Sequence, residues 1–426
     1  MSIWTSLLTG SSGLAAHGEA ISAVGDNIAN ISTVGYRGSR SQFDEMIGGT
    51  AANGQNQGIG VHMSGTETSF VQGSLSATGR ALDLAIRGAG LFAVSGRHNG
   101  IQGNYFTRDG RFSINNAGTI VNSEGLKLQG YIIDGSGKMA TNSSDLNIGG
   151  ISQPRSTTQS SIFANLDANA PILANFSAAD PSGTSNYATS VTVFDSLGAS
   201  HRVDMYFHRN GAGDWEWHGM ADGGELQNGT KGVATQIANG TMNFTASGAL
   251  NTATLISSNA NFVGAVPNQS IRFTFGDPIA TGGTGFAGTT QFSSASSVKA
   301  INQDGYGAGT LVDVSVNEDG LINGRFSNGQ TRAVARVALA TFGSHEGLQR
   351  MGSQLFVQTV QSGAPLIDAA ATSRNGSIVA GSVEGSNVDL GNELITLIAY
   401  QRAFTANSKI VTTADEMLAE VTNLKR

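Results

Sequence analysis

The sequence predicts a multidomain, mainly β protein. We expect two β-rich domains, the outer one inserted in the inner one, and N- and C-terminal α-helices that pair as a coiled coil. Apolar residues recur every seven positions near both ends, at Leu7, Leu14, Ile21 and Ile28 and at Leu390, Leu397, Phe404, Val411 and Leu418. We call these sets the N-terminal and C-terminal ladders. A sustained heptad forms one apolar stripe along a helix, which must be buried against another helix.

Composition narrows the class of protein. The chain has 426 residues, enough for two to four domains, and 13% of them are charged, against about 25% in ordinary soluble domains. The net charge is −7 and there is no run of Lys and Arg, so no nucleic acid is expected as a partner. There is no cysteine, which excludes disulfides and thiolate sites. No window approaches 18 apolar residues, so no membrane insertion is expected.

The first segment, residues 1–35, is predicted to be the N-terminal helix of an inner domain. Four glycines lie inside it, at Gly10, Gly13, Gly18 and Gly25, and each costs about 0.8–1 kcal/mol relative to alanine. The helix should therefore be weak alone and closely packed by its neighbours, and Gly35 should end it. The first basic residue is Arg37, so we expect no cleaved signal peptide. Residues 36–74 are polar and glycine-rich, and an extended connector is expected there.

The middle of the chain should be nearly all β. Residues 75–154 alternate apolar and polar side chains and form the first part of the inner β domain. Asp109-Gly110 is predicted to supply the positive φ of a tight hairpin turn. Residues 155–298 form the inserted outer domain, in which Val191–Gly198 opens a hairpin, and 299–375 form the second part of the inner domain.

The last segment, residues 376–426, is predicted to be the C-terminal helix of the same inner domain as the N-terminal helix. Ser386-Asn-Val-Asp389 is a helix start signal, and Lys425 and Arg426 suit the negative end of the helix dipole.

No catalytic, cofactor or metal site is expected, and the chain is not predicted to be an enzyme. Gly88-Ala-Gly90 leads into a strand and turn, whereas a dinucleotide fingerprint requires a helix there. His201, His208 and His218 match no ligand spacing and are expected on a solvated face. Asp214 and Glu216 with Trp215 and Trp217 imitate a glycosidase site, although a hairpin with its tryptophans packed inward is favoured.

Several strings resemble bacterial flagellar rod and hook proteins. Ala29–Arg37 is similar to the Ala-Asn-x-x-Thr-x-Gly-Tyr signature that follows their first helix, and Ser386–Leu390 with Tyr400–Lys409 is similar to their C-terminal signature, with Phe404 where Tyr is common. Leu82–Phe92 resembles their inner β domain, and Val191–His201 resembles the insertion of the hook branch. The matching motif positions are Asn30, Thr33, Gly35, Tyr36, Asn387, Asp389, Gln401, Arg402 and Asn407.

The resemblance implies a structural subunit that self-assembles into the flagellar hook, the flexible curved tube that transmits torque from the rod to the filament. It implies a homopolymer, contacts with a distal rod protein, a hook cap protein and a hook–filament junction protein, and passage through the flagellar type III export apparatus to an extracellular position in the hook and basal body. It implies no cofactor. Two alternatives remain, a distal rod protein with an inserted domain and a secreted β-rich protein that binds or cleaves glycans.

Overall fold

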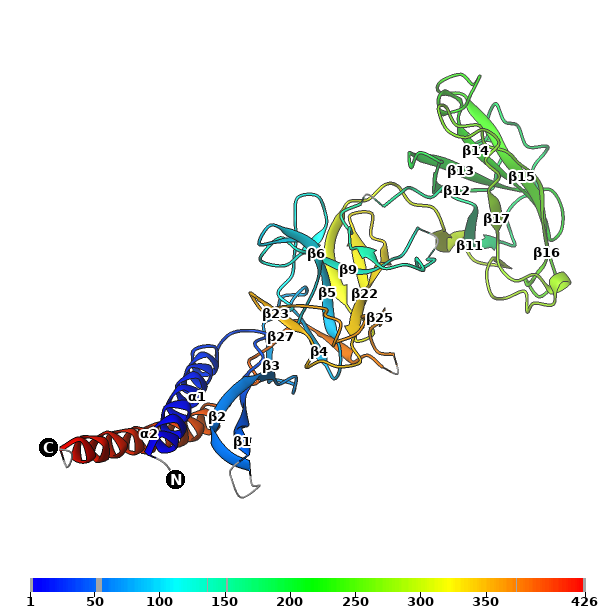
Figure 1. Cartoon of the computed structure of the whole chain (residues 1–426). Helices are drawn as coiled ribbons and strands as arrows, with labels where there is room; N and C mark the ends of the chain where they lie inside the picture. The colour runs from blue at the N-terminus through cyan, green and yellow to red at the C-terminus, as the bar shows by residue number, and fades with distance from the viewer. Residues whose placement is uncertain (1–2, 51–55, 136, 151, 373, 424–426) are drawn as a thin grey trace. The chain divides into compact units, whose positions relative to one another are not determined.

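The computed structural model describes residues 3–50, 56–135, 137–150, 152–372 and 374–423 (Figure 1). The chain divides into two compact units. Unit 1 contains residues 1–150, 312–325 and 331–426, and unit 2 contains residues 151–311 and 326–330. Unit 2 thus interrupts unit 1 in sequence. Both units are built mainly of strands and the terminal helices pack together, which confirms the predicted fold class.

The two helices belong to unit 1 and run antiparallel. They are α1 (Ile3–Ala29) and α2 (Leu390–Asn423), drawn in blue and red in Figure 1. Near one end of the pair a side chain at Gly10 would lie 2.9 Å from Val411, and near the other Asn27 Nδ2 lies 3.2 Å from Glu393 Oε1. Among the described residues, neither helix has the length and apolar character needed to cross a lipid bilayer.

A β-hairpin lies where the sequence predicts an extended connector, so that expectation for 36–74 is wrong. Strands β1 (Ser39–Thr50) and β2 (Asn56–Thr68) pair antiparallel with each other. The hairpin packs on α1, where Ser12 Oγ accepts a hydrogen bond from Val61 N at 3.2 Å. Gly60, at φ +129°, allows this approach, because a Cβ there would collide with Ser12.

The rest of unit 1 is built around one large sheet. Its strands follow the order β20-β21-β22-β9-β5-β6-β24-β23, with β7, β8, β10 and β25 paired at its sides. The bounds are β5 (Leu91–His98), β6 (Ile101–Thr107), β7 (Ser113–Ile114), β8 (Ile120–Val121), β9 (Lys127–Ile132), β10 (Ser144–Asp145), β20 (Leu311–Val316), β21 (Leu321–Phe326), β22 (Thr331–Thr341), β23 (Gln349–Gly352), β24 (Leu355–Val357) and β25 (Leu366–Ala369).

Two short pairs join the segment before α2 to the segment that follows the hairpin. Strand β26 (Ser377–Ala380) pairs with β4 (Leu84–Arg87), and β27 (Ser382–Glu384) pairs with β3 (Leu75–Ala77). The region 376–426 therefore begins with strands, and its helix starts at Leu390.

The hairpin predicted around Asp109-Gly110 does not form. Strand β6 pairs with β5 and β24, while β7 pairs with β8. Gly110 is not in the left-handed region. It is needed for a different reason, because a Cβ there would overlap the carbonyl oxygen of Leu84.

Unit 2 has a core between two sheets. The five-stranded sheet follows the order β12-β13-β14-β15-β16; in the other sheet β11 lies between β17 and β18 and also pairs with β19. The bounds are β11 (Gln159–Asp167), β12 (Tyr187–Phe194), β13 (Ser200–Arg209), β14 (Asp214–Asp222), η1 (Gly223–Glu225), β15 (Ala234–Phe244), β16 (Leu250–Ser258), β17 (Arg272–Thr274), η2 (Ile279–Thr281), β18 (Thr290–Phe292) and β19 (Ser297–Gln303). The Val191–Gly198 hairpin forms as predicted, with Gly198 at φ +83°.

Unit 2 is wider than the expected 155–298. Strand β19 pairs with β11, and isolated bridges Ser152–Gly309 and Arg155–Tyr306 continue the pairing of the incoming and outgoing chain. These pairings bring residues 299–311 into unit 2 instead of the inner domain.

The two tryptophans and the three histidines of unit 2 are buried. Trp215 and Trp217 are 1% and 0% exposed in the core, so they form no sugar platform beside Asp214 and Glu216. The three histidines are also buried, at 8%, 1% and 9% for His201, His208 and His218, so the expected solvated face is wrong. Their rings gain packing and hydrogen-bond partners inside: His201 stacks on Phe262, His218 stacks on Phe176, and His208 Nδ1 lies 2.9 Å from Thr184 O.

Candidate functional site

The contact between the two helices is made by small residues on α1. Gly10, Gly13, Ala16, Ala20 and Val24, which we call the seam, are all buried. A Cβ at Gly13 would lie 2.7 Å from the side chain of Asn407, so the glycine lets α2 approach closely. Gly10 and Gly13, two of the four glycines that weaken an isolated helix, therefore have a packing role, as the sequence predicts.

The two ladders lie beside this seam instead of forming it. Leu7, Leu14, Ile21 and Ile28 are half-buried, as are Leu397, Val411 and Leu418, whereas Leu390 and Phe404 are 45% and 41% exposed. A strict seven-residue repeat drifts by about 20° per heptad around a straight α-helix. Over the four steps between its five members the C-terminal ladder turns by about 80°, so its members cannot all face α1.

Large apolar side chains are exposed on the outer face of the helix pair. Near the N-terminus of α2, Leu390, Leu394, Ile395 and Ile398 are 44–68% exposed, and we call these four the outer apolar patch. On α1, Trp4 and Leu8 are 66% and 54% exposed, at the opposite end of the helix pair from this patch. Neighbouring exposed apolar side chains of this size are typical of a protein–protein contact surface. This surface is the part of unit 1 most suited to binding another chain.

The first family motif forms the turn after α1. Asn30 Nδ2 donates to Asp26 O at 2.9 Å, and Thr33 Oγ1 donates to Asn30 Oδ1 at 3.1 Å. Gly35 has φ +72° and its N donates to Glu384 O at 2.8 Å. A side chain at this glycine would be strained and would collide with the backbone around Asp109, so the turn requires glycine.

Tyr36 anchors this turn to the end of the helix pair. Its hydroxyl donates to Asn27 Oδ1 at 3.3 Å, and the guanidinium carbon of Arg350 lies 5.0 Å from the centre of its ring. Arg350 also donates a hydrogen bond to the carbonyl oxygen of Arg37. A cation over an aromatic face is stabilising at this distance.

Two asparagines fasten the helices to the hairpin. Asn387 Oδ1 accepts from Gly38 N at 2.7 Å, and its Nδ2 donates to Ser69 O at 2.8 Å. Asn27 Nδ2 donates to Ser39 O at 2.7 Å, and its Oδ1 accepts from Ser39 N at 2.9 Å. The sequence interpretation missed Asn27, although a polar residue continuing the seam spacing beyond Val24 is a usable signal.

A buried ionic cluster lies beneath these anchors. Glu384 is 0% exposed, and its carboxylate accepts hydrogen bonds from Arg37 at 2.7 Å, Arg108 at 3.0 Å and Gly73 N at 2.8 Å. Burial lowers the pKa of the Arg108 guanidinium, and the neighbouring Glu384 charge opposes that shift. The cluster joins four segments that are far apart in sequence, and no local pattern in the sequence reveals it.

Asp389 caps the N-terminus of α2. Its Oδ1 accepts a hydrogen bond from Asn392 N at 2.9 Å, as an N-cap carboxylate does. The predicted start at Ser386 is therefore three residues early, because Ser386 Oγ instead accepts from Val388 N within the preceding turn.

The remaining motif residues, all on α2, differ in how far they are exposed to solvent. Asn407 is half-buried over Gly13, and its Nδ2 donates to Ala403 O at 3.0 Å. Gln401 and Arg402 are exposed, and within the described residues their side chains make no hydrogen bond or ion pair. The structure of one chain therefore gives Asn407 a packing role and leaves the other two directed to solvent.

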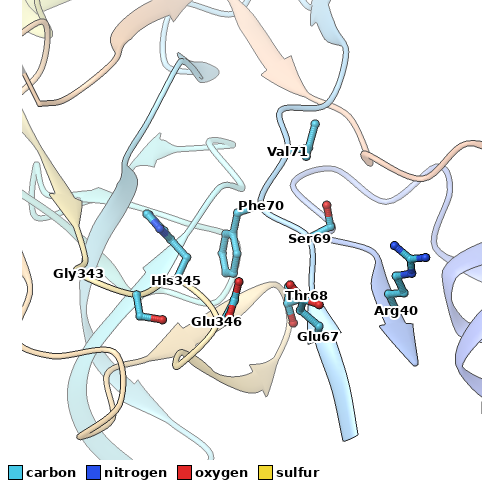
Figure 2. A pocket seen from close by; sticks show the side chains of 10 residues that line it. Arg40, Glu67, Thr68, Ser69, Phe70, Val71, Gly343, His345 and Glu346 are labelled. Carbon is cyan, nitrogen blue, oxygen red and sulfur yellow. The ribbon is translucent and has the colours of Figure 1, made fainter. Parts of the chain in front are cut away.

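Unit 1 also has an open groove of about 590 Å³ beside the hairpin (Figure 2). It is lined by Arg40, by the segment from Glu67 to Val71, and by the loop from Gly343 to Glu346. Phe70 lies against His345 with ring centres 5.3 Å apart, and burial lowers the pKa of His345. In the part of the chain that the structure describes, no group of three or more acidic, histidine or cysteine side chains is placed to hold a metal ion.

Four family models match consecutive parts of the chain. They are the flagella basal body rod protein (residues 7–37), the flagellar hook protein FlgE/F/G D1 domain (85–165), the flagellar basal body protein FlaE D2 domain (165–306) and the flagellar basal body rod FlgEFG protein C-terminal region (379–424). The first and last cover most of α1 and α2, and the third lies within unit 2.

Whole-chain relatives agree with these matches. The flagellar hook protein FlgE of Escherichia coli is 31% identical over 97% of this chain and 98% of its own length. The protein of the same name from Treponema pallidum is 31% identical over 99% of both chains. The crystal structure of Helicobacter pylori flagellar hook protein FlgE2 covers 71% of this chain and 98% of its own, with 15% identity and a TM-score of 0.45. The identity to full-length relatives shows that this chain belongs to the flagellar hook protein FlgE family.

Proposed function

We propose that this chain is a structural hook subunit that polymerises through its terminal helices. The observation that supports this most directly is the outer apolar patch, because apolar side chains 44–68% exposed on one helix face gain stability when another chain covers them. Many identical copies, each offering the same patch, would form a helical tube lined by α1 and α2.

The surface composition suits a flexible tube. With 13% charged residues and a net charge of −7, the chain presents a polar surface of low charge density. Shallow polar contacts between β units are weaker than a large apolar interface and can re-form as the tube bends. The helices would hold the tube together while the β units slide, which is the action of a universal joint in torque transmission from rod to filament.

Further partners follow from this role. We propose that the ends of the tube contact a distal rod protein and a hook–filament junction protein, and that a hook cap protein is present during assembly. The subunit would reach its extracellular position through the flagellar type III export apparatus. The glycan-binding alternative loses its support because both tryptophans are buried, and no observation favours a distal rod protein over a hook subunit.

The test uses the purified full-length chain. Ile395→Asp places a charge in the outer apolar patch at a residue 68% exposed, so the monomer should fold and the tube should fail to form. Ile256→Asp in unit 2, at a residue 65% exposed, is the matched control and should assemble. Sedimentation and electron microscopy measure assembly. Curved tubes of normal appearance from Ile395→Asp would contradict the proposal, as would a wild-type chain that never polymerises.

A further inference from the structure

The outer face of α1 carries acidic side chains without partners. Glu19 and Asp26 are seven residues apart and exposed, and neither forms an ion pair or side-chain hydrogen bond within the described residues. Asp26 also lies close to the C-terminus of α1, where the helix dipole disfavours a negative charge. No Lys or Arg occurs in α1 to compensate for it. A cation from outside the chain would relieve this unfavourable position.

The outer face of α2 carries the complementary pattern. Arg402 and Lys409 are also seven residues apart, exposed, and without an ion pair in the described residues. Seven residues correspond to a rise of about 10.5 Å along either helix. The two acids of α1 and the two bases of α2 therefore have the same spacing along their helices.

Small residues occupy the space between the charges. Ser22 and Gly25 lie between the acids, and Thr405 and Ala406 between the bases, all of them exposed. Gly25 is informative because it has no positive φ and a Cβ at this position would meet nothing within 4 Å. Nothing inside the chain requires a glycine there, and it costs α1 about 0.8–1 kcal/mol relative to alanine. Close approach by a second helix would account for it.

We propose that α1 of one copy packs through this outer face against α2 of a neighbouring copy, antiparallel, with Asp26 paired to Arg402 and Glu19 paired to Lys409. This inference rests on the proposed function, because it requires a polymer of this chain. Copies related by rotation about one axis and translation along it all point the same way. Since α1 and α2 are antiparallel within a copy, they are also antiparallel between copies, and this direction allows both pairs to form together.

The first test is a charge exchange in the full-length chain. Asp26→Arg or Arg402→Asp alone replaces attraction with repulsion and should raise the critical concentration for polymerisation about tenfold, which corresponds to about 1.4 kcal/mol. The combined Asp26→Arg, Arg402→Asp chain restores opposite charges and should recover most of this loss. Single variants that assemble like the wild type, or a double variant no better than its parents, would overturn the pairing.

Gly25→Ala separates a role in assembly from a role in folding. Alanine should stabilise α1 in the monomer, measured by circular dichroism, and yet raise the critical concentration, because its methyl group obstructs the neighbouring helix. Gly13→Ala is the contrasting variant, since its Cβ would press on Asn407 within the same chain and weaken the helix pair itself. Improved assembly of Gly25→Ala would contradict the close approach.

A disulfide tests the register directly, because the chain has no cysteine of its own. In the proposed register Ser22 faces Ala406 of the neighbour, and facing Cα atoms of closely packed helices are about 4–6 Å apart, within disulfide range. Oxidised tubes of the Ser22→Cys, Ala406→Cys chain should yield a ladder of covalent oligomers. Assembled tubes without intermolecular disulfides would overturn the register, whereas a wild type that does not assemble would refute the proposed function itself.

Discussion

Glu384→Gln should loosen the junction between the helix pair and the β part of unit 1. The substitution keeps the size of the side chain but removes a charge that faces Arg37 at 2.7 Å and Arg108 at 3.0 Å. The amide nitrogen of the glutamine is a hydrogen-bond donor, and it would face the guanidinium group of either Arg37 or Arg108, which is also a donor. Removing one partner of a buried ionic cluster leaves the other charges uncompensated and costs about 3–5 kcal/mol.

Hydrogen exchange of the full-length monomer measures this loss of stability at the junction itself. At 1.4 kcal/mol per factor of ten, amide protection in residues 33–40 and 379–389 should fall about 10²- to 10⁴-fold. Two of the three tryptophans lie in unit 2, so the urea midpoint followed by their fluorescence should stay close to the wild-type value. Asp313→Asn, which breaks the exposed Arg325 pair, is the control and should leave protection at the junction unchanged.

Unchanged protection in Glu384→Gln would refute the reasoning, because it would mean that the cluster contributes nothing beyond a neutral hydrogen bond. Equal losses in both units would also count against it, since the effect is predicted to be local to the junction.

Two further predictions concern unit 2. Burial lowers the pKa of His218 below its ordinary value of about 6.5, so the unfolded state takes up a proton first as the pH falls. The urea midpoint of unit 2 should therefore be constant above about pH 6.5 and decrease below it, and His218→Gln should make this decrease smaller. A wild-type midpoint that rises on acidification would contradict the prediction. Replacing residues 152–310 by a short linker, cut where Ser152 bridges Gly309, should leave tube formation possible but change curvature or bending stiffness in electron micrographs; tubes of unaltered curvature would show that unit 2 has no such role.

Much of the architecture follows from periodicity alone. The alternation at Leu82, Leu84 and Ile86 and the turn at Gly198 identify strands, and the terminal heptads identify the helices. The hairpin at 39–68 was missed because glycines and polar residues surround it, although Ile59, Val61 and Met63 alternate with period two in β2. The histidines of unit 2 were misplaced because strand alternation does not show which face another sheet covers.

The site was less predictable than the fold. The ladders indicate helices that pair, but apart from Val24 the seam consists of glycine and alanine, whose burial leaves little trace in hydrophobicity. The Glu384 cluster has no local signature, because Arg37 and Glu384 are 347 positions apart. Such contacts are set by the tertiary fold. The sequence indicates only that charged residues of these types need a partner when they are buried.

The position of Glu384 near the end of the sequence also determines when the buried ionic cluster can form. The first helix and the turn after it can be made early, but Arg37, Arg108 and Gly73 N lack their common acceptor until a residue near the end of the chain arrives. Contacts of such long range are slow to form, because a long loop must be closed before they are made. An unfinished chain therefore holds unpaired cations where a finished one holds a closed junction.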